Sequence, residues 1–208
     1  MLKTIRYAAF ALIAVIAAGW GIVWLRGGGV AQLGLDNIGL SIPGGVTLGG
    51  PFTLVDTTGA TVTDATYRGS WMLIYFGFTY CPDVCPTELQ TVSTALDRLG
   101  PLATKIAPIF ITIDPERDTP AALAEYVKLF DQRLIGLTGT QDQITAAARA
   151  FRVYHARANS KDATGYLMDH SSFVYLVGPD GTFRALFRQG MAPQEMADAL
   201  KTRLSAGG

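Results

Sequence analysis

The chain has 208 residues, a length that suits one ordinary domain with an appendage. Apolar residues make up 49% of it and charged residues 16%, which excludes a disordered chain and a highly charged nucleic-acid binder. Three of the 17 basic residues lie in the first 26 positions, so the remainder carries 14 basic against 17 acidic residues and offers no basic surface for DNA or RNA. Two cysteines are too few for a multi-disulfide framework, a four-cysteine zinc site or an iron–sulfur cluster.

An uncharged run of 19 residues, 7–25, lies near the N-terminus. As a helix it is roughly 29 Å long at ~1.5 Å per residue, close to the ~30 Å hydrocarbon core of a bilayer. The alternative is a cleaved signal peptide, but the run continues past the small residues at 17–19 and contains no cysteine for lipid attachment. We therefore predict an uncleaved transmembrane anchor over residues 1–26.

The charges that flank this run predict its orientation. Lys3, Arg6 and the amino terminus outweigh Arg26, so the N-terminus stays in the cytoplasm and everything after Arg26 is exported. The short, arginine-poor leader does not look like a mitochondrial transit peptide. The expected location is a bacterial inner membrane, crossed once, with the soluble domain facing the periplasm.

Residues 27–50 contain nine glycines and almost no charge, which predicts a flexible tether. As a coil it would span on the order of 27 Å. A domain over residues 51–208 would then stay close to the membrane surface, where it can meet a membrane-bound partner.

The remaining residues alternate between strand and helix patterns. The runs 71–78 and 106–113 are continuously apolar, as in strands that are buried on both faces. Further strands are predicted at 52–55, 61–63, 134–137 (a short edge strand), 173–177 and 182–187, and helices at 86–99, 120–130, 141–151 and 193–204. This order predicts an α/β domain, a thioredoxin-like mixed sheet with flanking helices on both faces.

Cys81 and Cys85 follow the first buried strand, where sites gather in open α/β sheets. Their spacing allows the sulfurs to form a disulfide or to bind one metal ion. Cys85 adjoins the N-terminus of a predicted helix, whose partial positive charge favours its thiolate. A structural disulfide that closes so short a loop would stabilise the fold little. The pair is therefore predicted to be redox-active or metal-binding.

His170 is the candidate for a third ligand. It stands just before the strand 173–177, and if that strand runs antiparallel to 71–78, His170 lies at the same end of the sheet as the cysteines. Two thiolates and one imidazole then converge. Soft sulfur donors select Cu(I) and an imidazole also supports Cu(II), whereas zinc would usually want a fourth ligand or water.

The soluble part of the chain resembles the Sco/SenC family of copper-binding, thioredoxin-like proteins. The matching stretches are 76–86 (FGFTYCPDVCP), 112–119 (TIDPERDT), 166–170 (YLMDH) and 175–181 (YLVGPDG). The extended block around the cysteines is specific, whereas Cys-x-x-x-Cys alone would be weak. One departure is Tyr80, where many relatives carry histidine, so an accessory histidine beside the first cysteine is not available here.

The resemblance implies that Cys81, Cys85 and His170 bind copper, as Cu(I) and Cu(II). It also implies a role in assembling the binuclear copper centre of cytochrome c oxidase. The expected partners are the copper-bearing subunit of the oxidase or another copper chaperone, besides the membrane that holds the N-terminal helix.

Four residues have weaker claims to the site. Asp114 and Asp118 form the family's Asp-x-x-x-Asp after the second buried strand and are possible accessory residues, as a polar rim or an influence on the thiol site. Alternatively, they form a turn and cap a helix. His155 is expected to be an ordinary half-exposed histidine, and Met168 a packing residue.

Three functional hypotheses follow. The leading one is a membrane-tethered copper metallochaperone, which needs no catalytic constellation. The second is an enzyme, a thiol–disulfide reductase that acts on the acceptor's cysteines through the same two thiols; oxidising Cys81 and Cys85 to a disulfide would abolish copper binding. The third is a redox or copper sensor. The extra residue relative to Cys-x-x-Cys and the nearby His170 argue against the reductase.

Overall fold

The computed structural model describes residues 48–159 and 165–206, which belong to one compact unit of the chain. The predicted anchor and residues 27–47 of the predicted tether lie outside this part. Within it, no helix has the length and apolar character needed to cross a membrane. Leu48 is buried and the Gly49 N–H donates to the carbonyl of Ala150 at 3.0 Å, so the packed domain includes residues just before position 51.

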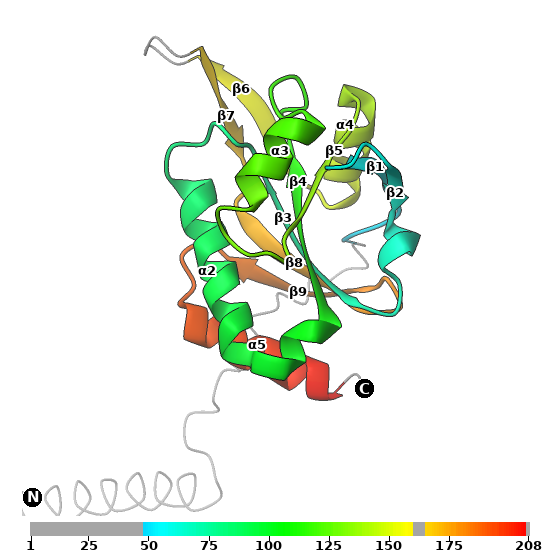
Figure 1. Cartoon of the computed structure of the whole chain (residues 1–208), viewed down its shortest axis with the longest axis vertical. Coiled ribbons are helices and arrows are strands. Elements are labelled where there is room, and N and C mark those ends of the chain that lie inside the picture. The colour runs from blue at the N-terminus through cyan, green and yellow to red at the C-terminus, as the bar shows by residue number, and fades with distance from the viewer. Residues whose placement is uncertain (1–47, 160–164, 207–208) are drawn as a thin grey trace, which may run out of the picture. The chain divides into compact units, whose positions relative to one another are not determined.

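A seven-stranded mixed sheet forms the centre of the domain (Figure 1). Strands β3, β4 and β5 run parallel, whereas β8 is antiparallel to β3 and β1 is antiparallel to β5. All residues of β3 are buried, as its apolar sequence predicts. In spatial order the strands are β2 (Thr61–Thr63), β1 (Thr53–Asp56), β5 (Ile135–Thr138), β4 (Ile106–Thr112), β3 (Trp71–Gly77), β8 (Phe173–Val177) and β9 (Phe183–Arg188).

Helices cover both faces of the sheet, which confirms the predicted layers. Tyr75 and Phe110 lie on the face that carries α2 and α3, and Phe110 packs against Tyr126 of α3. On the opposite face, the ring of Phe76 lies 5.4 Å from that of Phe151, directly after α4. Figure 1 shows α5 beside α2. The helices are α2 (Val84–Leu99), α3 (Pro120–Val127), α4 (Gln141–Ala150) and α5 (Pro193–Ala206), with short 3-10 turns η2 (Asp64–Tyr67) and η3 (Gly100–Lys105).

Three predicted boundaries or positions were wrong. The strand expected at an edge is β5, and it lies inside the sheet because β1 pairs along its outer side. Helix α2 begins at Val84, two residues before Pro86, so Cys85 is part of its first turn. Helix α3 ends at Val127, three residues earlier than predicted.

The structure also contains a hairpin that the sequence did not predict. Strand β6 (His155–Asn159) pairs antiparallel with β7 (Tyr166–His170) as a separate two-stranded sheet. In its register, His155 stands opposite His170 and Arg157 opposite Met168. Directly opposed residues project from the same face of an antiparallel pair, and so do residues two apart on one strand. Both histidines and Met168 therefore belong to one face of this hairpin.

Candidate metal centre

The two cysteines and His170 meet beyond the carboxyl end of β3. Cys81 lies in the loop that leaves β3, Cys85 in the first turn of α2, and His170 at the end of β7, immediately before β8. Because β8 runs antiparallel to β3, its first residues lie at the end of the sheet where β3 finishes. The convergence expected from the sequence is therefore confirmed, with the difference that His170 ends a strand rather than standing in a loop.

A side-chain contact joins Cys85 and His170. The Sγ of Cys85 lies 3.4 Å from Nε2 of His170, and both cysteines are free thiols. Nδ1 of the same ring lies 3.1 Å from the carbonyl oxygen of Ser171. A carbonyl only accepts hydrogen bonds, so this contact places a proton on Nδ1, and Nε2 is the ring nitrogen that faces the sulfur of Cys85.

The two thiols have opposite acidities. Hydrogen bonding from the Cys85 side chain, from His170 and from the backbone N–H of Cys85 lowers the pKa of Cys81 to about 4. That N–H lies 3.3 Å from the Sγ of Cys81, which thus accepts one of the free donors at the start of α2. The pKa of Cys85 is raised, by its hydrogen bond to Cys81 and by burial. The sequence-based expectation that the helix favours the Cys85 thiolate was wrong, because the half-buried Cys81 accepts the backbone N–H at the start of the helix while Cys85 is buried.

Gly77 makes room for the buried thiol. A Cβ at this position would lie 2.9 Å from Sγ of Cys85 and 2.8 Å from the ring of Phe110. Both neighbours are fully buried. The Cys85 sulfur can therefore occupy its position only because the last residue of β3 has no side chain.

Asp118 holds the start of the cysteine loop. Its buried carboxylate accepts hydrogen bonds from the backbone N–H of Thr79 at 3.0 Å, from the Thr79 hydroxyl at 2.6 Å and from the Thr112 hydroxyl at 2.6 Å. Burial raises the pKa of Asp118, and these bonds oppose the rise. The carboxylate thereby ties the segment before Cys81 to the end of β4.

Asp114 and Arg117 connect the cysteine loop to the hairpin that carries His170. Asp114 accepts hydrogen bonds from Nε of Arg117 and, at 2.6 Å, from the hydroxyl of Tyr166. The guanidinium of Arg117 lies 3.8 Å from the ring centre of Tyr166 and 4.6 Å from that of Tyr80. Its Nη1 donates to the carbonyl of Tyr166 at 3.0 Å. Arg117 was not singled out from the sequence, because a single arginine in a loop carries no pattern of its own.

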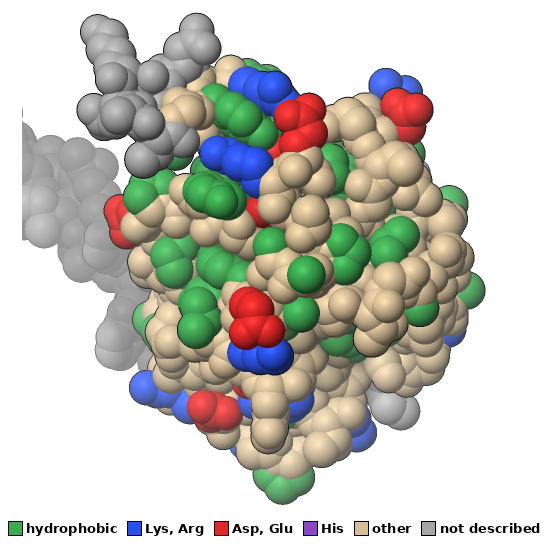
Figure 2. Space-filling model, turned by 45° about the horizontal axis from the view of Figure 1, so that its top comes forward, with side chains coloured by type: hydrophobic (Ala, Val, Ile, Leu, Met, Phe, Trp, Pro, Cys, Tyr) green, Lys and Arg blue, Asp and Glu red, His purple; other side chains and the backbone are tan. Residues whose placement is uncertain are grey.

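Aromatic rings enclose the imidazole of His170. The rings of Tyr75 and Phe78 meet it edge-on, with centres 6.2 and 6.0 Å away. Tyr80, in contrast, is 58% exposed and packs on Arg117. Figure 2 shows the domain with its top turned forward: hydrophobic side chains are scattered among uncharged polar side chains and backbone, and basic and acidic side chains lie beside one another in several places.

No group of three or more His, Cys, Asp or Glu side chains in residues 48–159 and 165–206 already stands as a metal-binding cage. The sulfur of Cys81 is directed at a backbone N–H. The structure therefore brings Cys81, Cys85 and His170 together without arranging them as a ready metal-binding cage.

The sequence profile of the SCO1/SenC family matches residues 42–205. The human mitochondrial SCO1 homolog is 46% identical over 159 residues, which cover 76% of this chain and 53% of that protein. The chain thus spans about half the length of this relative.

Solved structures agree with this match. A copper-bound structure of Bradyrhizobium japonicum ScoI superposes with a TM-score of 0.69 at 44% identity, covering 74% of this chain and 98% of that one. BsSco, described as a member of the Sco family of cytochrome c oxidase assembly proteins with a disulfide switch, has a TM-score of 0.61 at 25% identity, covering 77% of this chain and 93% of its own. With the family profile matching most of its length, this chain belongs to the SCO1/SenC family.

Proposed function

We propose that this chain is a copper metallochaperone, which binds copper through Cys81, Cys85 and His170 and helps to assemble the binuclear copper centre of cytochrome c oxidase. The observation that carries the proposal is the 3.4 Å approach of Cys85 Sγ to Nε2 of His170, beside a second free thiol. Copper-bound relatives of the same family support the choice of metal.

The donor set suits copper as a cargo in both oxidation states. Two thiolates satisfy Cu(I), and the imidazole adds the nitrogen donor that Cu(II) prefers. Binding requires Cys85 to lose its proton. Cys81 is only half-buried, so its sulfur stays accessible to an acceptor. A thiolate of the acceptor can then replace Cys81 as a ligand and take over the copper.

The alternative function, a thiol–disulfide reductase, is favoured by the unequal thiols. Cys81 is accessible and has the lowered pKa, so its thiolate would attack an acceptor disulfide. Cys85 would then displace the acceptor's second thiol, which leaves a Cys81–Cys85 disulfide and a reduced acceptor. A disulfide consumes both sulfur donors, so the oxidised chain is expected to bind no copper.

Transfer of bound copper to an isolated apo copper domain of the oxidase tests the chaperone directly. We expect the copper-loaded chain to fill the reduced acceptor, as followed by the absorbance of the binuclear centre. The apo, reduced chain incubated with the oxidised acceptor measures reductase activity in parallel. Reduction of the acceptor without any copper transfer would contradict the chaperone and support the enzyme.

The location is part of the same proposal. We infer that residues 1–26 anchor the chain in a bacterial inner membrane and that the domain faces the periplasm. This rests on the charges flanking the 19-residue apolar run. A reporter that is active only outside the cytoplasm, fused after Gly208, should be active. Activity of a cytoplasm-specific reporter at the same position would contradict this orientation.

A further inference from the structure

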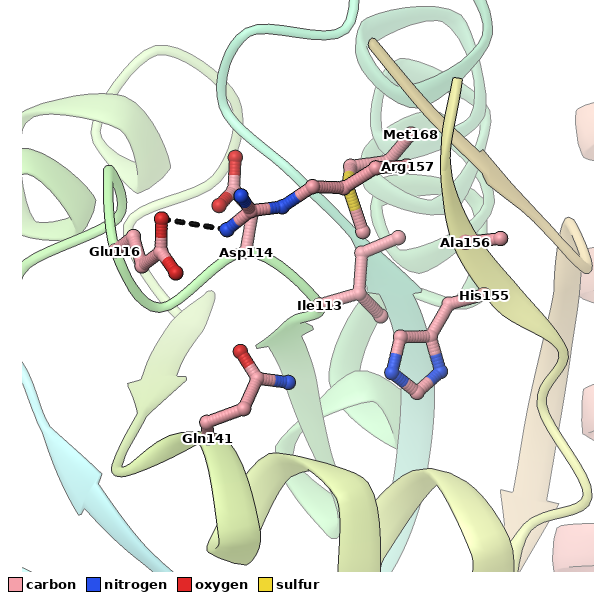
Figure 3. A pocket seen from close by; sticks show the side chains of 8 residues that line it. All are labelled: Ile113, Asp114, Glu116, Gln141, His155, Ala156, Arg157 and Met168. Carbon is pink, nitrogen blue, oxygen red and sulfur yellow. Dashed lines mark ion pairs between the residues drawn. The ribbon is translucent and has the colours of Figure 1, made fainter. Parts of the chain in front are cut away.

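A cavity of about 370 Å³ lies between the β6–β7 hairpin and the loop that follows β4 (Figure 3). The side chains of His155, Arg157 and Met168 enter it from the hairpin. The loop contributes Asp114 and Glu116. The cavity lies on the hairpin face that also carries His170, since His155 and His170 are opposed in the register.

The cavity gathers two donor types that copper prefers. Of the four methionines in the described residues, Met72, Met191 and Met196 are at most 2% exposed, whereas Met168 is half-buried and lines the cavity. A half-buried thioether at a cavity wall is available to a soft ligand, unlike one in the core. The ring nitrogens of His155 make no hydrogen bond to any described residue, in contrast to those of His170.

The charges around the cavity do not oppose a cation. Arg157 forms an ion pair with Glu116, drawn as a dashed line in Figure 3, and Arg117 forms one with Asp114. Each guanidinium is therefore balanced by a carboxylate at short range. A monovalent cation in the cavity meets no uncompensated positive side chain from its lining.

We propose that His155 and Met168 form a second, weaker Cu(I) site that loads the thiol site. This inference rests on the proposed function, because it takes copper as the cargo. An imidazole and a thioether are both neutral donors suited to Cu(I), and they bind it less strongly than two thiolates do. Opposed Cα atoms in an antiparallel pair are ~4.5–5.5 Å apart, so His155 is the cross-strand neighbour of His170, which itself contacts Cys85.

Cu(I) binding by the full chain with Cys81→Ser and Cys85→Ser isolates this site. Under anaerobic conditions, with a chromophoric Cu(I) chelator as competitor, we expect the thiol-free chain to retain about one weakly bound equivalent. Adding Met168→Leu or His155→Asn should weaken it ~10-fold or more, since even outer-shell partners of a metal are worth roughly 10–100-fold. Gln141→Ala, which changes the same cavity without removing a soft donor, should leave the affinity unchanged.

A second measurement keeps the inference falsifiable if a variant folds poorly. With methionine methyl groups labelled in the thiol-free chain, titration with Ag(I), a redox-inert analogue of Cu(I), should shift the Met168 signal and leave those of Met72, Met191 and Met196 in place. No Cu(I) bound by the thiol-free chain, or binding abolished by His170→Ala but not by Met168→Leu, would overturn the second site. Either result leaves the proposed function intact, because that function is tested on the parent chain, by its copper binding and by copper transfer to the acceptor.

Discussion

Replacing Cys85 with serine is expected to damage the thiol copper site in both oxidation states, whereas replacing His170 should weaken Cu(II) binding there far more than Cu(I) binding. Cu(I) is satisfied by two thiolates in a near-linear arrangement, so losing one thiolate should weaken it more than ~100-fold, the upper end of what an outer-shell change costs. His170→Ala should weaken Cu(I) by about tenfold at most. Cu(II) prefers nitrogen donors and higher coordination, so His170→Ala should weaken it far more than Cu(I).

Two readouts on the same variants measure this difference. Cu(I) affinity comes from competition with a chromophoric chelator, and Cu(II) binding from the thiolate-to-metal absorption band. Cys81→Ser and Cys85→Ser should erase that band, while His170→Ala should shift and weaken it. Gln90→Ala, an exposed position further along α2, is the matched control and should behave like the parent. An unchanged Cu(II) spectrum and affinity in His170→Ala would remove His170 from the ligand set.

The sequence predicted the site more fully than it predicted the surroundings of the site. The buried strands β3 and β4 were visible as continuous apolar runs, and one topological assumption, that β8 runs antiparallel to β3, was enough to bring His170 to the cysteines. The predicted start of a helix at residue 120 is also confirmed, and there the Thr119 hydroxyl accepts a hydrogen bond from the N–H of Ala122. These features depend on short stretches of sequence or on a single pairing.

The features that were missed depend on contacts between distant segments. The hairpin β6–β7 has little apolar character of its own, and its packing includes Tyr166 on Arg117 and His170 on Phe78. Strand β5 lies inside the sheet because β1, far from it in the sequence, pairs along its outer side, and no local sequence pattern encodes this pairing. The unequal acidity of the thiols reflects which sulfur reaches the backbone N–H of Cys85, and spacing along the chain alone does not decide this.

Gly77→Ala is expected to damage the metal site without removing any donor. The added Cβ would lie 2.8 Å from the Phe110 ring, 2.9 Å from Sγ of Cys85 and 3.1 Å from the Tyr75 ring. These three neighbours are 0–1% exposed, so none can move into solvent. The backbone of Gly77 does not lie in the left-handed region, so the effect is one of space and not of backbone strain. Overpacking of this kind costs about 1–3 kcal/mol of stability. We also expect the added methyl group to push the Cys85 sulfur away from its position at the site.

Control variants must distinguish a loss of Cu(I) affinity caused by the displaced Cys85 thiol from one caused by lower stability of the fold. Ile144→Val in α4 removes one buried methyl group and should cost about 0.5–1.5 kcal/mol, while Gly50→Ala places a Cβ at an ordinary 3.4 Å from Ala150 and should cost little. Urea unfolding gives the stability of each variant, and chelator competition gives its Cu(I) affinity. We expect both Gly77→Ala and Ile144→Val to lower stability, but only Gly77→Ala to lower Cu(I) affinity. If Gly77→Ala binds Cu(I) as tightly as the parent, the space beside β3 does not determine where the Cys85 sulfur stands.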